Sequence, residues 1–380
     1  MTITLILSSP PGYSETFFNS KIKGLQEDGH KVILVTASTL EHYEACVYLK
    51  HPQVYSNPVK QVVAMFLTYL SLLPYLKRTL RYIQLEKEEG TGLRRLLEKL
   101  YLNATLLKLK TNWLHFGFAT MALERELVAQ AIGAKLGVSF RGYDIFVYPL
   151  KHFECYQLLW KKVDEVHSLS RALLNRAYQL GLPKETAFRI IPPAVHENLF
   201  SYKKIISNSN NKLQLLTIGR LHYIKGISTL INTARLLKDK GLDFEWTVIG
   251  SGSKQEEERY LFQRHQLQLH DHVHFIGKKD HLSTLSYLSK TDLYVQPSLS
   301  EGFCNAVLEA QALGKLCVVS DAEGLAENVL DKQTGWIVPK LNPEALAQKI
   351  QDVIHLSESK QCKIRQQAIQ RVQEKFNLEE

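Results

Sequence analysis

The chain has 380 residues, a length that favours two domains over one. Its 45% hydrophobic and 22% charged residues are those of a soluble globular protein. The longest uncharged run, residues 61–76, is short for a membrane span, and residues 1–9 fit a buried strand better than a signal peptide. The five cysteines form no C-x-x-C pair, which argues against a disulfide framework and predicts a reducing, cytoplasmic location.

Short apolar, β-branched runs alternate with helical patterns along the chain, which predicts parallel sheets covered by helices on both faces. In the first half, we expect strands at residues 3–7, 32–36, 113–116, 137–140, 165–169 and 189–192. In the second half, we expect strands at residues 213–218, 246–249, 273–276, 293–296, 316–320 and 335–338. Between the halves, residues 201–211 have the composition of a linker. We therefore predict an α/β protein with domains at 1–205 and 206–380.

The segment 60–110 is basic, with ten Lys or Arg against four Glu, and it carries +6 of the net charge of +9. Apolar residues 65–73 precede cations that interleave with leucines. Such helices can lie in a membrane interface with their cations on anionic head groups, or pack on the sheet as ordinary amphipathic helices. Nucleic acid is the weakest partner class, because no helix-turn-helix, zinc-finger or RNP-like signature accompanies the charge.

Two glycine turns follow the first two strands of the second half. The first strand leads into Gly219, Arg220 and then Lys225. Two cations five residues apart after a glycine turn suit a diphosphate, although two solvated surface cations would give the same pattern. The next strand ends at Gly250 and Gly252, where the backbone can approach an anion at a helix N-terminus. Glycine turns end many strands, so this second signal is weak by itself.

The strand at 293–296 leads into Glu301 and, eight residues later, Glu309 on the following helix. Both carboxylates can face one ligand. The amides of Phe303, Cys304 and Asn305 come at or near the start of that helix. They can cradle a phosphate while the helix dipole offsets its charge. The alternative is an exposed helical Glu309 and a helix N-terminal Glu301.

In order, these runs are GRLxxxKG, VIGSG, VHFIGK and PSxxEGFxNAxxEAxAxG, the last at residues 297–314. Together they resemble the signature of the family-4 retaining glycosyltransferases, and the resemblance covers nearly the whole chain. It implies the GT-B fold, in which two Rossmann-like domains with parallel sheets face one another across a cleft. It also implies an N-terminal domain that binds the acceptor and a C-terminal domain that binds a nucleotide-sugar donor.

The resemblance assigns roles to the donor-side residues. Arg220 and Lys225 are expected to neutralise the nucleotide diphosphate, with the β-phosphate or the sugar on the amides of residues 303–305. Glu309 is expected to hold the ribose hydroxyls and Glu301 the hydroxyls of the transferred sugar. The loop around Gly277 is expected to border the base, and Gly219 and Gly250 give the backbone access to the donor.

Three N-terminal features resemble a polysaccharide-assembling branch of this family. Ser14, Glu15 and Thr16 stand in an SETF motif that either binds acceptor or caps a helix. His115, in an HF element at a strand end, has either a site role or a structural one.

The third feature is the run SFRGYD, which contains Arg141 and Asp144. Relatives often carry His in place of Arg141, near the reacting carbon, so the catalytic imidazole is left open. Arg141 instead either stabilises phosphate charge or binds an acidic acceptor, and Asp144 is expected on the acceptor side.

The mechanism implied is attack from the face of the leaving group, because no compelling nucleophile is present. No Asp-x-Asp occurs, which argues against metal-dependent GT-A enzymes, and no cofactor or metal is expected. The His-rich stretch at 265–274 shows no fixed third ligand for a metal. The chain ends soon after Phe376, where relatives have a helix that crosses back to the N-domain, so we expect a short or cut C-terminus.

The function predicted is transfer of a sugar from a nucleotide-diphosphate sugar to a carbohydrate or lipid-linked acceptor. We expect this transfer in bacterial cell-surface polysaccharide or glycolipid assembly, in the cytoplasm or peripherally on the cytoplasmic face of the membrane. Two alternatives stay open, a GT-B sugar-nucleotide epimerase and a non-catalytic nucleotide-sugar-binding or scaffold subunit. The sequence does not select the base, sugar, acceptor or oligomeric state.

Overall fold

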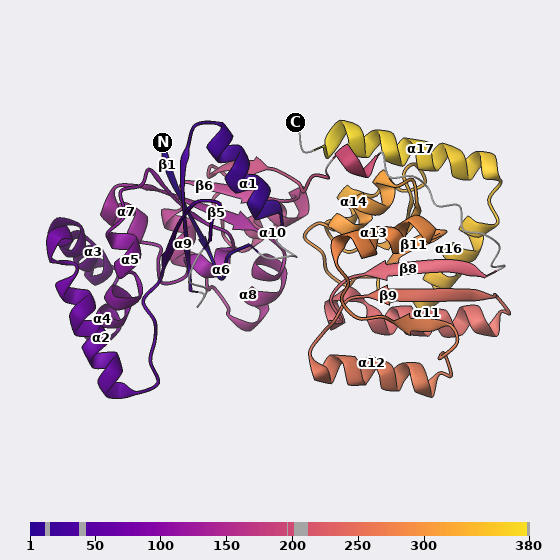
Figure 1. Ribbon diagram of the computed structural model, residues 1–380, viewed down its shortest axis with the longest axis horizontal. Helices are drawn as coiled ribbons and strands as arrows, with labels where there is room; N and C mark the ends of the chain where they lie inside the picture. Colours follow the sequence, from indigo (N-terminus) through magenta and orange to yellow (C-terminus); the bar gives the residue numbers. More distant parts are fainter. Residues whose placement is uncertain (12–15, 38–42, 196, 201–211, 378–380) are drawn as a thin grey trace. The chain divides into compact units, whose positions relative to one another are not determined.

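The computed structural model describes residues 1–11, 16–37, 43–195, 197–200 and 212–377. They form two compact units (Figure 1). The N-terminal unit comprises Met1–Leu169 and Leu173–Ile191, and the C-terminal unit comprises Ser170–Ala172 and Pro192–Glu380. The predicted linker, residues 201–211, lies outside the described residues.

The N-terminal unit is built on a seven-stranded parallel sheet in the order β3-β2-β1-β4-β5-β6-β7. Its strands are β1 Thr2–Leu7, β2 Lys31–Thr36, β3 Val47–Lys50, β4 Trp113–Phe116, β5 Lys135–Phe140, β6 Glu165–Ser168 and β7 Ala187–Ile190. The strand order reverses between β1 and β4. Open α/β sheets bind ligands beyond the carboxyl ends of their strands at such a switch point.

Two edge strands differ from the prediction, because an edge strand carries a weak apolar signal. The strand β3 was not predicted, and its side chains are exposed or only half-buried. The strand β7 begins and ends two residues earlier than predicted. Pro192 has no N–H to donate to a ladder, so the strand ends before it.

The C-terminal unit repeats this plan in a six-stranded parallel sheet, in the order β10-β9-β8-β11-β12-β13, with its switch point between β8 and β11. Its strands are β8 Leu213–Ile218, β9 Phe244–Ile249, β10 Val273–Phe275, β11 Leu293–Gln296, β12 Leu316–Ser320 and β13 Trp336–Val338. The predicted α/β class with two parallel sheets is confirmed.

Helices cover both faces of the C-terminal sheet, with α13, α14 and α17 on one side of β8 and β9 and with α11 and α12 on the other (Figure 1). Their bounds are α11 Ile227–Asp239, α12 Lys254–Gln266, α13 His281–Lys290, α14 Asn305–Ala312, α15 Leu325–Asn328, α16 Pro343–Ile354 and α17 Glu358–Lys375. The fully buried Trp246 lies in the core between sheet and helices, and its indole N–H donates to Thr217 Oγ1 at 3.0 Å. The core thereby fixes the middle strands that carry the site.

In the N-terminal unit, α2, α3 and α4 form an arm that stands away from the sheet (Figure 1). Their bounds are α2 Pro58–Leu70, α3 Leu76–Glu88 and α4 Leu93–Leu102. Asn57 begins the arm, because its side chain accepts a hydrogen bond from the Lys60 amide at 3.1 Å and so caps α2. The unit's other helices are α1 Thr16–Glu27, α5 Ala104–Leu107, α6 Ala119–Ala122, α7 Val128–Ile132, α8 Tyr148–Lys151, α9 Gln157–Lys162 and α10 Arg171–Gln179.

Within the described residues, no single helix has the length and apolar character needed to cross a membrane. The pair Pro58–Leu70 and Leu73–Glu88, bent by 48°, meets the criteria only when both helices are taken together.

Candidate functional site

The switch point of the C-terminal sheet brings two of the predicted motifs together. Because β8 and β11 are neighbours, the turn after β8 lies beside the loop after β11. Lys225, which ends the 3-10 turn Tyr223–Lys225, places its Nζ 2.5 Å from Glu301 Oε1. These two residues are 76 positions apart in the sequence. A cation and a carboxylate, each expected to bind donor, thus hold one another in the protein.

Glu301 is only 6% exposed, and a chain of buried polar side chains fixes its position. Ser298 Oγ donates to Glu301 Oε1 at 2.9 Å, and Gln296 Nε2 donates to Ser298 Oγ at 2.8 Å. Tyr294 OH donates in turn to Gln296 Oε1 at 2.6 Å. None of these three supporting residues was predicted from the sequence. Their signal was present, because polar side chains at every second position of an otherwise apolar, buried strand share one face.

The Glu301 carboxylate stabilises the charge of Lys225. Burial and the nearby Arg220 oppose the charge of Lys225, but the Glu301 carboxylate outweighs both, and the pKa of Lys225 is raised. Burial, together with the charge of Glu301, raises the pKa of the Cys304 thiol to about 12. Lys225 therefore keeps its positive charge, and the neighbouring Cys304 thiol is uncharged. Arg220 itself is exposed at the end of β8.

Close backbone approach makes two glycines necessary. Gly226 has φ +69°, and a Cβ there would lie 1.8 Å from the carbonyl oxygen of Pro297. Gly250 has φ +149°, and a Cβ there would lie 1.8 Å from the carbonyl oxygen of Gly219. By contrast, a Cβ on Gly219 would make only ordinary contacts with the Lys225 side chain at 3.6 Å, and one on Gly277 would meet open space. The turns after β8, β9 and β11 therefore touch through glycine.

The helix α14 begins at Asn305 after Cys304, and no side chain caps its first turn. The Cys304 amide, which was predicted to cradle phosphate, donates to Asn328 Oδ1 at 3.0 Å. Asn328 Nδ2 donates back to the Cys304 carbonyl at 3.1 Å, which locks this loop. The amides of Phe303 and Asn305 remain the candidates for an anion at this helix start.

Glu309, on α14, contacts a residue that the sequence analysis did not single out. Its Oε1 lies 3.1 Å from His281 Nε2 at the start of α13. The hydrogen bond that His281 donates to the Glu309 carboxylate raises the pKa of His281 against the effect of burial. A ribose bound by Glu309 would therefore share that carboxylate with His281.

In the N-terminal unit, His115 belongs to a polar cluster near the carboxyl ends of β4, β5 and β6. His115 Nε2 lies 3.1 Å from Lys21 Nζ and 2.8 Å from Ser139 Oγ, and Ser139 Oγ lies 3.0 Å from His167 Nδ1. Burial and the Arg141 charge lower the pKa of Lys21 to about 7, and burial and the Lys21 charge lower that of His115. The sequence placed His115 at a strand end but did not show that it joins Lys21, Ser139 and His167 in one cluster.

Arg141 and Asp144 take different positions. The Arg141 guanidinium lies over the rings of Phe17 and Phe18, at 4.0 Å and 4.7 Å from their centroids. Asp144 is buried, and its carboxylate accepts hydrogen bonds from the backbone amides of Arg141, Gly142 and Ala119. In this structure Asp144 thus organises the loop after β5.

The remaining acceptor-side predictions are Ser14, Glu15 and Thr16. Ser14 and Glu15 lie outside the described residues, and Thr16 is the first residue of α1. In the part of the chain that the structure describes, no three His, Cys, Asp or Glu side chains are grouped to hold a metal ion. Within the His-rich stretch, His265 contacts His270 at 3.0 Å.

Comparison with known proteins matches the C-terminal unit to a family of glycosyltransferases. Residues 201–373 match the family described as Glycosyl transferases group 1. The putative colanic acid biosynthesis glycosyltransferase WcaL of Escherichia coli (strain K12) is 29% identical over 273 residues, which cover 69% of this chain and 66% of WcaL. The capsular polysaccharide biosynthesis glycosyltransferase CapM of Staphylococcus aureus is 30% identical over 230 residues, 56% of this chain and 58% of CapM. The matches span less than two thirds of either relative.

The fold has close counterparts among solved structures. Anabaena Alr3699/HepE, in a crystal structure with UDP and glucose, has a TM-score of 0.72 at 16% identity, over 99% of this chain and 95% of that one. A likeness at this identity concerns the fold alone. The chain therefore has the two parallel-sheet units of the GT-B fold, and its residues 201–373 are similar to the Glycosyl transferases group 1 family.

Proposed function

We propose that the protein transfers a hexose from a nucleotide-diphosphate sugar to a carbohydrate or lipid-linked acceptor, with retention of configuration. The observation that carries the proposal is the Lys225–Glu301 pair at the β8/β11 switch point, next to Arg220 and the start of α14. Two cations, Arg220 and Lys225, beside a helix N-terminus suit a diphosphate, and the fixed carboxylate of Glu301 suits sugar hydroxyls. The relatives named for colanic acid and capsular polysaccharide biosynthesis favour an acceptor in cell-surface polysaccharide or glycolipid assembly.

In the proposed complex, Arg220 and Lys225 bind the diphosphate with the amides of Phe303 and Asn305. Glu301 accepts hydrogen bonds from the sugar, and Glu309 accepts them from the ribose. The loop at Gly277 borders the base. A nucleotide that binds in this way would put its phosphates beside two cations, so metal is not required to neutralise them. UDP and glucose, present in the Anabaena structure of the same fold, are one such donor pair.

Transfer breaks the bond between the anomeric carbon and the diphosphate oxygen and forms a bond from that carbon to the acceptor oxygen. Negative charge collects on the departing phosphate, where Arg220, Lys225 and the α14 N-terminus stabilise it. Glu301 is tied to Lys225 and Ser298, and Cys304 is a neutral thiol, so neither is an activated nucleophile. We therefore assign attack to the face of the leaving group, with the acceptor proton passing to the departing diphosphate.

The test is transfer from donors carrying a radiolabelled sugar to a membrane extract that contains lipid-linked glycans, with EDTA present. We expect label from one nucleotide-sugar to enter the glycan fraction and the new linkage to keep the anomeric configuration of the donor. The Glu301→Gln variant keeps the side-chain volume but loses the charge, and we expect a rate on the order of a hundredfold lower. Inversion, or activity only with added metal, would contradict the proposed mechanism.

We also place the protein in the cytoplasm, at the inner face of an anionic membrane, because a lipid-linked acceptor resides there. The basic arm α2–α4 supports this placement.

A further inference from the structure

The helix α2 presents its apolar side to solvent. Each of its 13 residues is exposed or half-buried, and Phe66 is 61% exposed. The large exposed apolar side chains follow a helical repeat of three and four positions and therefore form one stripe. They are Val59, Val62, Val63, Phe66, Leu67 and Leu70. An amphipathic helix of a soluble domain normally turns such a stripe inward, and this helix does the opposite.

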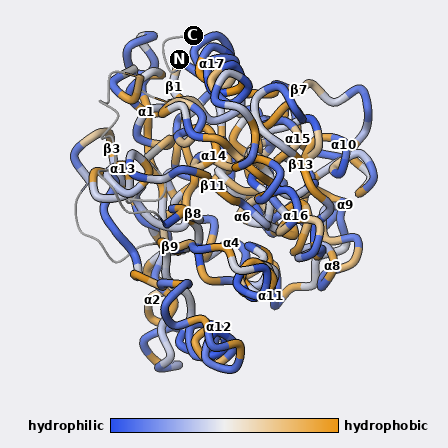
Figure 2. Tube along the Cα trace, turned by 90° about the vertical axis from the view of Figure 1, so that its right-hand side faces the viewer, coloured by the Kyte–Doolittle hydropathy of each residue, from blue (hydrophilic) through white to orange (hydrophobic). Residues whose placement is uncertain are grey.

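The stripe continues beyond α2. Leu73, Leu76 and Leu80, again three and four positions apart, are each at least half exposed. Figure 2 shows hydrophobic residues along the tube at α2. A contiguous exposed apolar surface of this kind marks a contact with another molecule or with a membrane.

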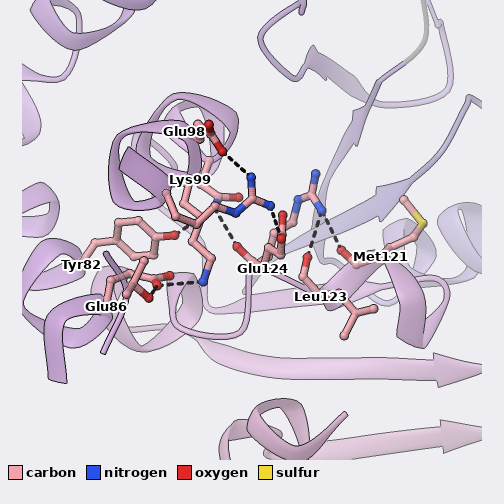
Figure 3. Close-up of polar contacts among 11 residues, drawn as sticks. Tyr82, Glu86, Glu98, Lys99, Met121, Leu123 and Glu124 are labelled. Atoms are coloured by element: carbon pink, nitrogen blue, oxygen red, sulfur yellow. Dashed lines mark hydrogen bonds and ion pairs between the residues drawn. The ribbon is translucent and has the colours of Figure 1, made fainter. Parts of the chain in front are cut away.

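Polar contacts hold the helices of the arm to one another. Tyr69 OH donates to the Leu97 carbonyl at 2.9 Å, and this bond holds α2 on α4. Deeper in the unit, Lys99 Nζ lies 2.8 Å from Glu86 Oε2, in a buried ion pair between α4 and α3 (Figure 3). The three helices are therefore held together, and the residues of the apolar stripe remain exposed.

The charge of the segment indicates what covers the stripe. From residue 45 to residue 85 the chain contains no Asp or Glu. Lys60, Lys77 and Arg81 are exposed along the arm in this stretch. A second copy of the chain on the same stripe would bring cations against cations. Lipid head groups with negative charge would instead neutralise them.

We propose that α2 and the first turns of α3 lie in the interface of an anionic bilayer. The stripe would enter the boundary between head groups and acyl chains, with the cations of the arm on lipid phosphates. Since the buried side of the arm is tied to its unit, it docks on the surface as a preformed element. This inference rests on the proposed placement at a membrane, and it is tested separately from sugar transfer.

The test is sedimentation of the protein with vesicles of phosphatidylglycerol and with vesicles of phosphatidylcholine. We expect wild type to bind the anionic vesicles, and Phe66→Glu to lower that binding at least tenfold. The matched control is Phe262→Glu on α12, where the phenylalanine is 65% exposed, and it should bind like wild type. The triple variant Lys60→Gln/Lys77→Gln/Arg81→Gln should weaken binding on the order of a hundredfold.

Equal binding by Phe66→Glu and wild type, or equal binding to both lipids, would overturn the inference. So would a wild-type dimer in sedimentation velocity that Phe66→Glu dissociates, because the stripe would then bind a second copy. Calorimetry with a soluble nucleotide-sugar separates the two proposals. Phe66→Glu should bind donor like wild type, and a protein that binds vesicles but no donor would reject the donor assignment alone.

Discussion

Replacing Lys225 with alanine should cost about 3 kcal/mol of folding free energy, because it leaves a buried carboxylate without its cation. Glu301 is 6% exposed, and its partner Lys225 lies 2.5 Å away. Ser298 still donates one hydrogen bond, which does not replace a charge. Urea-induced unfolding, compared with wild type, measures the loss.

Two further variants control this result. Lys225→Met/Glu301→Gln removes both charges and should recover most of the stability lost by the single variant. Lys254→Ala breaks an exposed ion pair with Glu258 and should change stability by less than about 0.5 kcal/mol. A Lys225→Ala protein as stable as Lys254→Ala would mean that Glu301 does not depend on this cation.

Gly226→Ala should lose about 3 kcal/mol of stability and also weaken donor binding. The added Cβ would lie 1.8 Å from the Pro297 carbonyl oxygen, at a residue with φ +69°. The backbone must then move, and it carries the neighbouring Lys225 away from Glu301. Chemical unfolding and calorimetry measure the two effects.

Gly241→Ala is the matched control for this substitution. Gly241 has φ +74°, but a Cβ there meets no atom within 4 Å. Both alanine variants therefore lose about 1 kcal/mol of stability from the left-handed backbone. The difference between their free energies of unfolding measures the contact with Pro297. Equal losses in the two variants would show that the turns after β8 and β11 do not press on one another.

Much of the C-terminal unit follows from its sequence. The predicted strands at 213–218, 293–296 and 316–320 match β8, β11 and β12 at both ends. Buried parallel strands are rich in apolar and β-branched residues, and the turn residues Gly219 and Pro297 directly follow β8 and β11. The order of a doubly wound sheet then puts the ends of β8 and β11 side by side.

Side-chain partners were harder to predict than strand ends. Pattern and spacing placed Glu301 and Lys225 at one sheet edge, but their ion pair depends on rotamers and on packing across 76 residues. The hydrogen bond from the Cys304 amide to Asn328 likewise depends on α15, which comes later in the sequence. Local sequence carries no information about such contacts.

The arm shows the same limit for surfaces. The apolar residues 65–73 and the cations after them predicted helices that either lie in a membrane interface or pack on the sheet. The structure leaves Phe66 and Leu67 exposed, while Tyr69 of α2 donates a hydrogen bond to the Leu97 carbonyl of α4. The sequence of a helix determines which of its faces is apolar, and the fold determines what that face contacts.

The most direct measurement is calorimetric titration with UDP-, GDP-, ADP- and CMP-sugars in EDTA, on wild type, Arg220→Ala and Arg259→Ala. Arg220 is exposed, as is the control Arg259 on α12, so neither change should disturb folding. We expect one nucleotide-sugar to bind wild type and Arg259→Ala equally, and Arg220→Ala about ten- to a hundredfold more weakly. If no nucleotide-sugar binds, or if Arg220→Ala binds as tightly as wild type, the β8/β11 switch point is not the donor site.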